Sequence, residues 1–553
     1  MTTLHILRLL LVGSTLAALT YIALRPRAVW RVVGGFLNHR TYAVSLAVIR
    51  ILLFTRLYMA ATGINLVALT EAPARTRNLP PGWGWLGELV PLFDIDFANA
   101  VRAVFIVAAP LAIVGAGTRF TAPVAALISA YLLGLPNFFS KINHGGHLLV
   151  CFCIILAFSR CADALSVDEL VRGARQRRLS LSRSDTRSLA YGLPIRLCWV
   201  FLALAYFFPG LYKTWNAGDQ WLNGYALLII AYEKLATLTE YRPLIIIYDS
   251  PILLAFLGVG TLVFELGFIF LMLSRRFWWI APIVAIGFHC GLAFSIGIIP
   301  WGIVKVFWVF VDVGVILYVF RRRIPQRVLD LLGIGADPPT AEPATAEPAT
   351  AEPAEPVTAA SGTAEPAPDS AKAGLAVTDS AKPAASRAAA PKTAAARPAA
   401  SKAEPNWTVS ATAGGTVVGL MLFTGLAGID TFPVAIFPRF DTRRVETENP
   451  RPSRYMLAIQ PEEGEPKEIS QTKLPKEARR ARWDKTLRNL RRAKGEARQS
   501  QYRAIEALLK HGGQRFKPGD RLVLYREYLQ FDPKTHDRVV VERTLISSYT
   551  VGR

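Results

Sequence analysis

Long apolar runs dominate the first 320 residues and give the first structural prediction. Nine segments there are long enough to cross about 30 Å of hydrocarbon as helices, and a tenth follows a long polar gap. We expect these spans at 4–24, 42–70, 98–117, 119–138, 145–160, 194–212, 251–273, 278–298, 301–320 and 408–428. The pattern therefore predicts an all-α polytopic membrane bundle of about nine spans plus one.

Composition and charge agree with a membrane protein and predict its orientation. The chain is 52% hydrophobic with a positive mean hydropathy, which is more apolar than soluble proteins of this length. Its net charge of +22 does not indicate nucleic-acid binding, because the arginines mostly flank apolar runs. Basic clusters follow the first, fifth, seventh and ninth spans, at 25–40, 172–187, 275–276 and 321–323. By the positive-inside rule this side is cytoplasmic.

The orientation places the N-terminus outside, together with the connections 71–97, 139–147 and 213–250. The first span is expected to remain as an anchor rather than a cleaved signal, because its positive charges follow the apolar stretch. Arg8 interrupts this span, and we expect its side chain to extend toward the membrane surface.

The polar remainder of the chain predicts a linker and a small extramembrane domain. Residues 334–405 repeat Ala, Pro, Glu and Thr, a composition that cannot bury enough apolar surface to fold. The tail has strand character at 453–459, 521–529 and 539–549, and a basic helical stretch at 476–510. That helix is either a solvated surface or a binding surface for acidic lipids or partners. The predicted domains are a membrane anchor and basic loop (1–40), a membrane domain (41–325), a disordered cytoplasmic linker (334–405), a further transmembrane helix (408–428) and a basic α+β tail outside the membrane (429–553).

The cysteines predict neither a metal site nor disulfides. They lie in or beside apolar segments and have no metal-ligand spacing. We expect small buried hydrophobic side chains at all five positions, which are Cys151, Cys153, Cys161, Cys198 and Cys290.

Lys213 is the first candidate for chemistry, because it closes an apolar run that begins at Leu197. An ionisable group at this depth is a functional-site hypothesis by default, since the bilayer favours the neutral amine, which is a base. The alternative is an interfacial anchor, in which Lys213 extends to the surface beside Tyr212 and Trp215.

Further polar residues lie near the outer half of the predicted bundle. Asn143, His144 and His147 precede or begin the fifth span and belong either to an exposed loop or to a site. His289 lies about a dozen residues into the eighth span, which is roughly 18 Å across it at 1.5 Å per residue. A histidine there requires a hydrogen-bond partner or a wet cavity and serves either helix association or chemistry. Glu265 in the seventh span is a natural partner for a histidine or a lysine.

Several short sequences together resemble a known family. They are Asn143-His144, Leu165-Ser-Val-Asp168, Tyr206-Phe-Phe-Pro-Gly-Leu-Tyr-Lys213, Trp221-Leu-Asn-Gly-Tyr225, Phe288-His-Cys290 and Phe294-Ser-Ile-Gly297. In order and spacing, the region of about 40–325 resembles the bacterial HTTM domain, the membrane domain shared with vitamin K-dependent γ-glutamyl carboxylase. A bacterial relative of this kind is expected in the plasma membrane.

The resemblance implies a carbon–carbon lyase type of chemistry, the carboxylation of glutamate residues. Its cofactor would be reduced vitamin K or a menaquinol-type quinone, with oxygen and carbon dioxide as co-substrates. Lys213 matches the family's base, His144 its oxyanion-stabilising histidine, and His289 a further histidine near the active centre. The candidates for a substrate or quinone pocket are Asn143, Tyr212, Trp215, Trp221 and Glu265.

The chain departs from the family pattern in two respects. Family carboxylases often place two lysines together, whereas Tyr212 precedes Lys213 here. The large lumenal portion that recognises a propeptide is not evident, and a basic tail follows the linker instead. The expected partners are the lipid bilayer and a glutamate-containing protein substrate, with no nucleic acid. The alternative function is a non-enzymatic HTTM membrane scaffold that binds quinone or lipid and presents its tail to partners.

Overall fold

A computed structural model describes most of the chain outside the Ala- and Pro-rich segment. The described residues are 2–70, 90–139, 144–178, 180–237, 243–274, 276–297, 304–335, 408–427, 453–469, 486–487, 490–511, 514–531 and 538–552. The predicted linker (334–405) therefore lies outside the described residues from position 336 onward. Ile334 is buried and packs with Tyr42 and Val44, so the folded membrane domain extends to the start of that segment.

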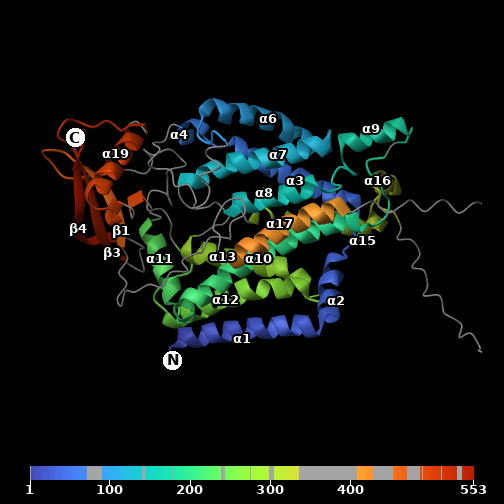
Figure 1. The fold of residues 1–553 in the computed structure, drawn as a ribbon, viewed down its shortest axis with the longest axis horizontal. Helices are drawn as coiled ribbons and strands as arrows, with labels where there is room; N and C mark the ends of the chain where they lie inside the picture. The colour runs from blue at the N-terminus through green and yellow to red at the C-terminus, as the bar shows by residue number, and fades with distance from the viewer. Residues whose placement is uncertain are drawn as a thin grey trace, which may run out of the picture. The chain divides into compact units, whose positions relative to one another are not determined.

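Helices make up the membrane domain (Figure 1). Those before the linker are α1 (Thr3–Leu24), α2 (Pro26–Leu37), α3 (Ala43–Thr62), α4 (Leu66–Thr70), α6 (Ile95–Val114), α7 (Thr118–Gly134), α8 (His144–Ala157), α9 (Val167–Arg175), α10 (Leu189–Leu222), α11 (Tyr225–Thr237), α12 (Pro251–Leu273), α13 (Ala281–Ile296), α15 (Val313–Val319) and α16 (Gln326–Leu332). A further apolar helix, α17 (Thr408–Ala427), follows the linker. Part of the predicted basic loop after the first span is thus helical, as α2.

Among the described residues, seven helices are long and apolar enough to cross a membrane, and their positions agree with seven of the predicted spans. They are Thr3–Leu24, Ala43–Thr62, Ile95–Val114, Thr118–Phe138, Leu189–Leu222, Pro251–Leu273 and Trp278–Ile296. The predicted spans at 145–160 and 408–428 appear as the shorter apolar helices α8 and α17. The chain is a mostly helical membrane protein.

The prediction of one continuous helix over 301–320 is wrong in its described part. A 3₁₀ turn at Phe307–Phe310 is followed by extended backbone and then by α15. The carboxylate of Asp312 caps α15 by accepting a hydrogen bond from the backbone N–H of Val315. It also accepts hydrogen bonds from Thr41 and Ser45. An acidic residue held in this way begins a helix rather than continuing one.

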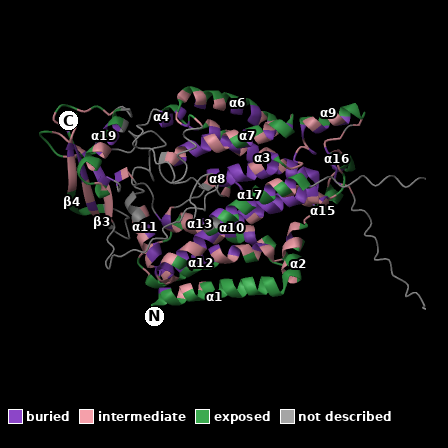
Figure 2. Ribbon diagram, viewed as in Figure 1, coloured by how far each residue is buried: buried purple, intermediate pink, exposed green. Residues whose placement is uncertain are grey.

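The central helix is α10, and its sequence is apolar on all sides. Of its most apolar segment 89% is buried, compared with none of that of α1 (Figure 2). Such a helix is stable when other helices surround it. The predicted span ended at position 212, but the helix continues to Leu222. Lys213 is therefore a residue within a helix and not the first residue of a loop.

Two glycines allow α10 and α12 to pack closely. A Cβ atom at Gly210 would lie 2.8 Å from the Cβ of Glu265, and one at Gly258 would lie 2.1 Å from the carbonyl oxygen of Trp221. Small residues at such positions are typical of membrane helix interfaces, because they let backbones approach. The two contacts flank Lys213 along α10.

The buried-cysteine prediction is confirmed at four of the five positions. Cys151, Cys153, Cys161 and Cys198 are buried as free thiols, whereas Cys290 is exposed. The exception follows from helix geometry, because Cys290 lies next to buried His289 on α13 and consecutive helical residues point in different directions. The expectation of a buried side chain at Cys290 is therefore wrong.

The tail forms a small α+β domain, as predicted. Its antiparallel sheet has the order β2-β1-β3-β4 and is formed by β1 (Ser453–Gln460), β2 (Lys467–Glu468), β3 (Arg521–Phe531) and β4 (Arg538–Thr550). Helix α19 (Gly495–His511) contributes Tyr502 and Leu509 to the core of this domain. Much of the predicted helical stretch before position 486 lies outside the described residues.

Asp168 connects α9 to the start of α7. Its two carboxylate oxygens accept hydrogen bonds from the backbone N–H groups of Gly117 and Thr118, at 2.8 and 2.9 Å. Burial opposes ionisation of this carboxyl group, but these two hydrogen bonds, together with the positive charge of Arg172, outweigh it. The pKa of Asp168 therefore lies below its ordinary value of 3.8.

Replacing Asp168 with Asn should weaken this cap. We expect the Asp168→Asn protein to lose about 0.5–1 kcal/mol of unfolding free energy at neutral pH, the lower part of the range for cap losses, because the carboxylate is partly exposed. A carboxylate with a depressed pKa stabilises the fold above its unfolded-state pKa and loses this effect as the pH falls through its folded-state pKa. The difference in thermal midpoint between the two proteins should therefore shrink below pH 3.8. A difference that is constant across that range would contradict the assignment.

Candidate functional site

Lys213 lies inside the bundle and forms an ion pair. Only 2% of the residue is exposed, and its Nζ lies 2.5 Å from Oε1 of Glu265 on α12. The ring of Trp221 lies 4.6 Å from the same nitrogen. A lysine that served as an interfacial anchor would extend to the surface, so this geometry argues against the anchor interpretation.

The ion pair is energetically costly, and the polar groups around it are only partly satisfied by hydrogen bonds. Removing two charges from water costs several kcal/mol per ion, and their mutual attraction offsets this only with good geometry and further hydrogen bonds. Oε2 of Glu265 and Nε1 of Trp221 are buried, and neither has a hydrogen-bond partner among the described residues. The site therefore presents one unused acceptor and one unused donor beside the lysine.

His289 forms a second buried polar pair. Its Nε2 lies 2.7 Å from the hydroxyl of Tyr206 on α10, and 5% of the residue is exposed. Aromatic rings surround the pair, at centroid distances of 4.9 to 6.0 Å from Tyr206 or His289, and belong to Phe264, Phe268, Phe288 and Phe307. The other ring nitrogen, Nδ1, is buried without a partner in the described part of the chain.

The two pairs belong to one cluster. Tyr206 and Lys213 are seven residues apart on α10, about two helical turns, and therefore share a face. On α12, Phe264 adjoins Glu265, and its ring packs against those of Tyr206 and Phe288 at 5.0 and 4.1 Å. Helices α10, α12 and α13 thus bring together a lysine, a carboxylate, an imidazole and a phenol within an aromatic surround.

The remaining predicted site residues lie away from this cluster or outside the described residues. Trp215 is 42% exposed, and its carbonyl accepts a hydrogen bond from Arg8 of α1, whose guanidinium lies over its ring. Tyr212 is half-buried against the main core. His144 is the first residue of α8, but its side chain is not among the parts of the chain that the structure describes, and neither is Asn143.

His147, which the sequence left open between loop and site, is buried. It is 1% exposed, and its ring packs edge-on against Phe201 of α10 at 5.7 Å. The first turn of α8, which begins at His144, therefore packs toward the central helix.

Tyr206 and Arg56 are residues of interest to which the sequence analysis assigned no role. Tyr206 lies in the family-like motif, and the need of a mid-span histidine for a hydrogen-bond partner is the signal that could have identified it. Arg56 lies in α3, within the predicted span 42–70. Like Lys213, it is an ionisable residue inside a span and therefore indicates a functional site. Each signal requires knowing which helices are neighbours, which the sequence does not give.

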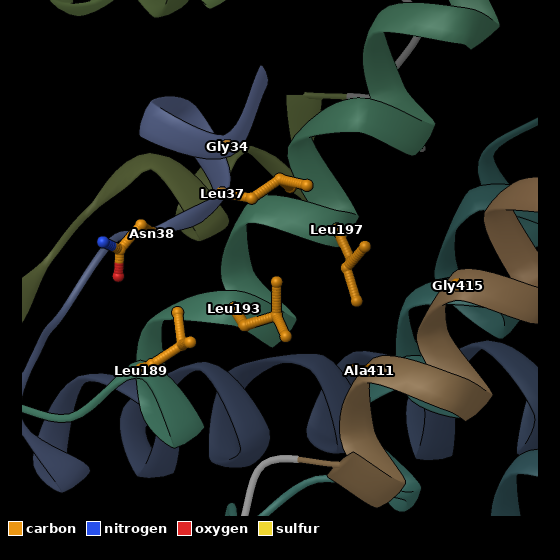
Figure 3. Close-up of a pocket in the computed structure, with 8 residues that line it drawn as sticks. All are labelled: Gly34, Leu37, Asn38, Leu189, Leu193, Leu197, Ala411 and Gly415. Atoms are coloured by element: carbon orange, nitrogen blue, oxygen red, sulfur yellow. The ribbon is translucent and has the colours of Figure 1, made fainter. Parts of the chain in front are cut away.

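A separate apolar cavity of about 380 Å³ lies between α2, α10 and α17 (Figure 3). Leu189, Leu193 and Leu197 of α10 line it, opposite Ala411 and Gly415 of α17. Leu197 lies sixteen residues before Lys213, about 24 Å along the helix. The cavity is thus distinct from the polar cluster, and its lining suits an apolar chain.

Comparison with protein families identifies the membrane domain. The HTTM domain model matches residues 38–314, half of the chain. The chain belongs to the HTTM-domain family. The matched HTTM region includes α3 through α13 and so contains Lys213, Glu265, Tyr206 and His289. Searches of curated proteins and of solved structures gave no match.

A double-mutant cycle tests the buried pair in this HTTM protein. Removing one partner leaves an uncompensated buried charge, so Lys213→Met and Glu265→Leu should each reduce the unfolding free energy by about 3–5 kcal/mol. The double variant should be more stable than either single variant, because it leaves no isolated charge. Thermal unfolding in detergent measures all four proteins. Additive losses in the double variant would mean that the two side chains are not paired.

The second pair has a milder substitution. Tyr206→Phe keeps the aromatic packing but removes the hydroxyl from His289, which leaves a buried imidazole nitrogen unsatisfied at a cost of about 1–3 kcal/mol. Phe207→Leu is a control on the same helix, since Phe207 is only half-buried. Equal thermal stability of Tyr206→Phe and the wild-type protein would contradict the hydrogen bond.

Proposed function

We propose that this HTTM protein is a quinol-dependent, carboxylase-like membrane enzyme that acts on glutamate residues. The observation that carries the proposal is the buried Lys213–Glu265 pair, at the position that matches the family's lysine base. Its orientation in a bacterial plasma membrane is proposed from the basic loops, with the N-terminus and tail outside and the linker in the cytoplasm.

The cluster fits a reduced quinone by its chemistry. Such a molecule has a flat aromatic ring and two hydroxyl groups. The aromatic surround of Phe264, Phe288 and Phe307 suits the ring, while Oε2 of Glu265 and Nδ1 of His289 are buried atoms that lack partners in the described structure. When bound with oxygen, a reduced quinone supplies the strong base that removes a γ-proton from glutamate, after which carbon dioxide is captured.

The residues of this chain would manage protons and exclude water. The Nζ of Lys213 donates a hydrogen bond to the Glu265 carboxylate. Transfer of that proton to the carboxylate would leave the lysine nitrogen with a free lone pair, which would accept a proton from a neighbouring hydroxyl. Tyr206 fixes the orientation of the His289 ring through its hydrogen bond. The aromatic surround keeps water away, which a carbanion requires.

Incorporation of labelled carbon dioxide tests the proposal. Purified protein receives a reduced quinone, oxygen and a glutamate-containing peptide, and the label in the peptide is counted. General-base catalysis typically contributes 10²–10⁴-fold, so Lys213→Met should lower the rate by roughly that factor. Label that appears equally in this variant would remove Lys213 from the mechanism.

Stability must be separated from chemistry in this experiment. The Lys213→Met/Glu265→Leu protein is the matched control, because it should fold better than the single variant and yet incorporate no label. Arg119→Gln, an exposed change on α7, should retain full incorporation. An active double variant would contradict the proposal.

The apolar cavity favours a second function, that of a lipid- or quinone-binding scaffold without chemistry. Its volume of about 380 Å³ falls within the usual range of ligand sites, which is roughly 300–1,000 Å³. Saturable binding of a long-chain quinone, with no label incorporated under any condition, would support this function. Binding lost in Leu193→Trp and retained in Lys213→Met would place the ligand in the cavity.

A further inference from the structure

A second, polar cavity of about 250 Å³ lies between α3, α7, α8 and the 305–306 segment. Arg56 of α3 and Lys305 line it, together with Gly145 and Gly146 in the first turn of α8. Among the described residues that line it, two are basic and none is acidic. The cavity therefore collects positive charge inside the membrane domain.

Arg56 is unusual because nothing in the described structure pairs with it. Its side chain forms no hydrogen bond, ion pair or ring contact there, and its Nε is buried. By contrast, Arg50 on the same helix donates to the carbonyl oxygens of Cys161 and Leu165. Arginines within membrane helices normally pair or face a wet cavity, and Arg56 lines a cavity in which the described residues supply no partner for it.

The other walls of the cavity reinforce the same charge preference. Helix α8 begins at His144, and the first turn of a helix carries the positive end of its dipole. Such an end attracts anions. Glycine at 145 and 146 leaves no side chain to keep a ligand from the backbone. Basic side chains and a helix N-terminus around one cavity give it a positive potential, which favours an anion there.

Two consecutive residues connect the cavity with the polar cluster around Lys213 and His289. Val306 lines the cavity, and the next residue, Phe307, packs against the ring of His289 at 6.0 Å. A ligand in the cavity would therefore lie on the other side of this short segment from the candidate reaction centre.

We infer that this cavity is an oxyanion-binding site, which takes a carboxylate or a phosphate group. Arg56 provides a planar fork of donors for two oxygens, and Lys305 provides a second positive charge at the more exposed side. The two sources of such a group are a soluble carboxylate and the headgroup of a phospholipid. The inference stands independently of the proposed function, because it requires neither Lys213 nor a quinone.

Direct binding to the full-length protein tests the site. The protein is purified in a maltoside detergent, which contains no phosphate, and titrated with glutarate or with dihexanoyl phosphatidylglycerol. Thermal stabilisation and calorimetry report the affinity. We expect saturable binding of at least one probe, and the preferred probe identifies the source. No saturable binding of either would overturn the inference.

Two variants and one control locate the binding. Loss of a charge-assisted hydrogen bond should weaken affinity by about tenfold or more, so Arg56→Gln and Lys305→Gln should both bind less tightly. Arg119→Gln removes the same charge from an exposed position on α7 and should bind like the wild-type protein. If Arg56→Gln does not fold, Lys305→Gln decides, because its side chain is exposed. Unchanged affinity in Lys305→Gln and in any folded Arg56→Gln protein would overturn the inference, as would an equal loss in the control.

Discussion

The pairing of Lys213 with Glu265 is the constraint on which the arrangement of the central helices depends. Neither charge is stable alone in a medium of low dielectric constant, so α10 and α12 must approach until the two side chains meet. The approach is possible because Gly210 and Gly258 carry no side chains at the crossing. Close packing then excludes water, which makes the pair more dependent on its own geometry.

Much of the fold follows from the sequence because the bilayer limits the choices. Apolar runs of about twenty residues must be helical, and seven spans appear where those runs lie. Two of the errors occur where the sequence shows a polar residue but not its partner. Lys213 was predicted to follow the end of a span, because a lone lysine is expected at the membrane interface. The helix continues past it, and Glu265 forms an ion pair with it inside the bundle. Asp312 was taken as part of a span, yet it caps a new helix.

The candidate site was predicted in part for the same reason. Glu265 was expected to pair with a lysine or a histidine, but the sequence does not choose between partners on different helices. Trp215 shows the consequence of a misplaced helix end. Residues two positions apart on a helix point in nearly opposite directions, so a helical Trp215 must face away from Lys213, toward α1. The prediction of a loop after Lys213 gave no information on the direction of the Trp215 side chain.

Lys213 and Arg56, two of the charged residues inside the HTTM domain, differ in whether the described residues pair with them. Lys213 is paired with a carboxylate from its own chain, and the second oxygen of Glu265 and the Nε1 of Trp221 are the buried groups beside it without a partner among the described residues. Arg56 has no such partner in the described structure, and it lines the adjoining cavity. A buried pair retained for stability alone has no advantage over apolar residues of similar volume. A partly buried charge without a partner has even less. This energetic cost is the reason for which we propose chemistry at the first and binding at the second, on two sides of the segment that carries Phe307.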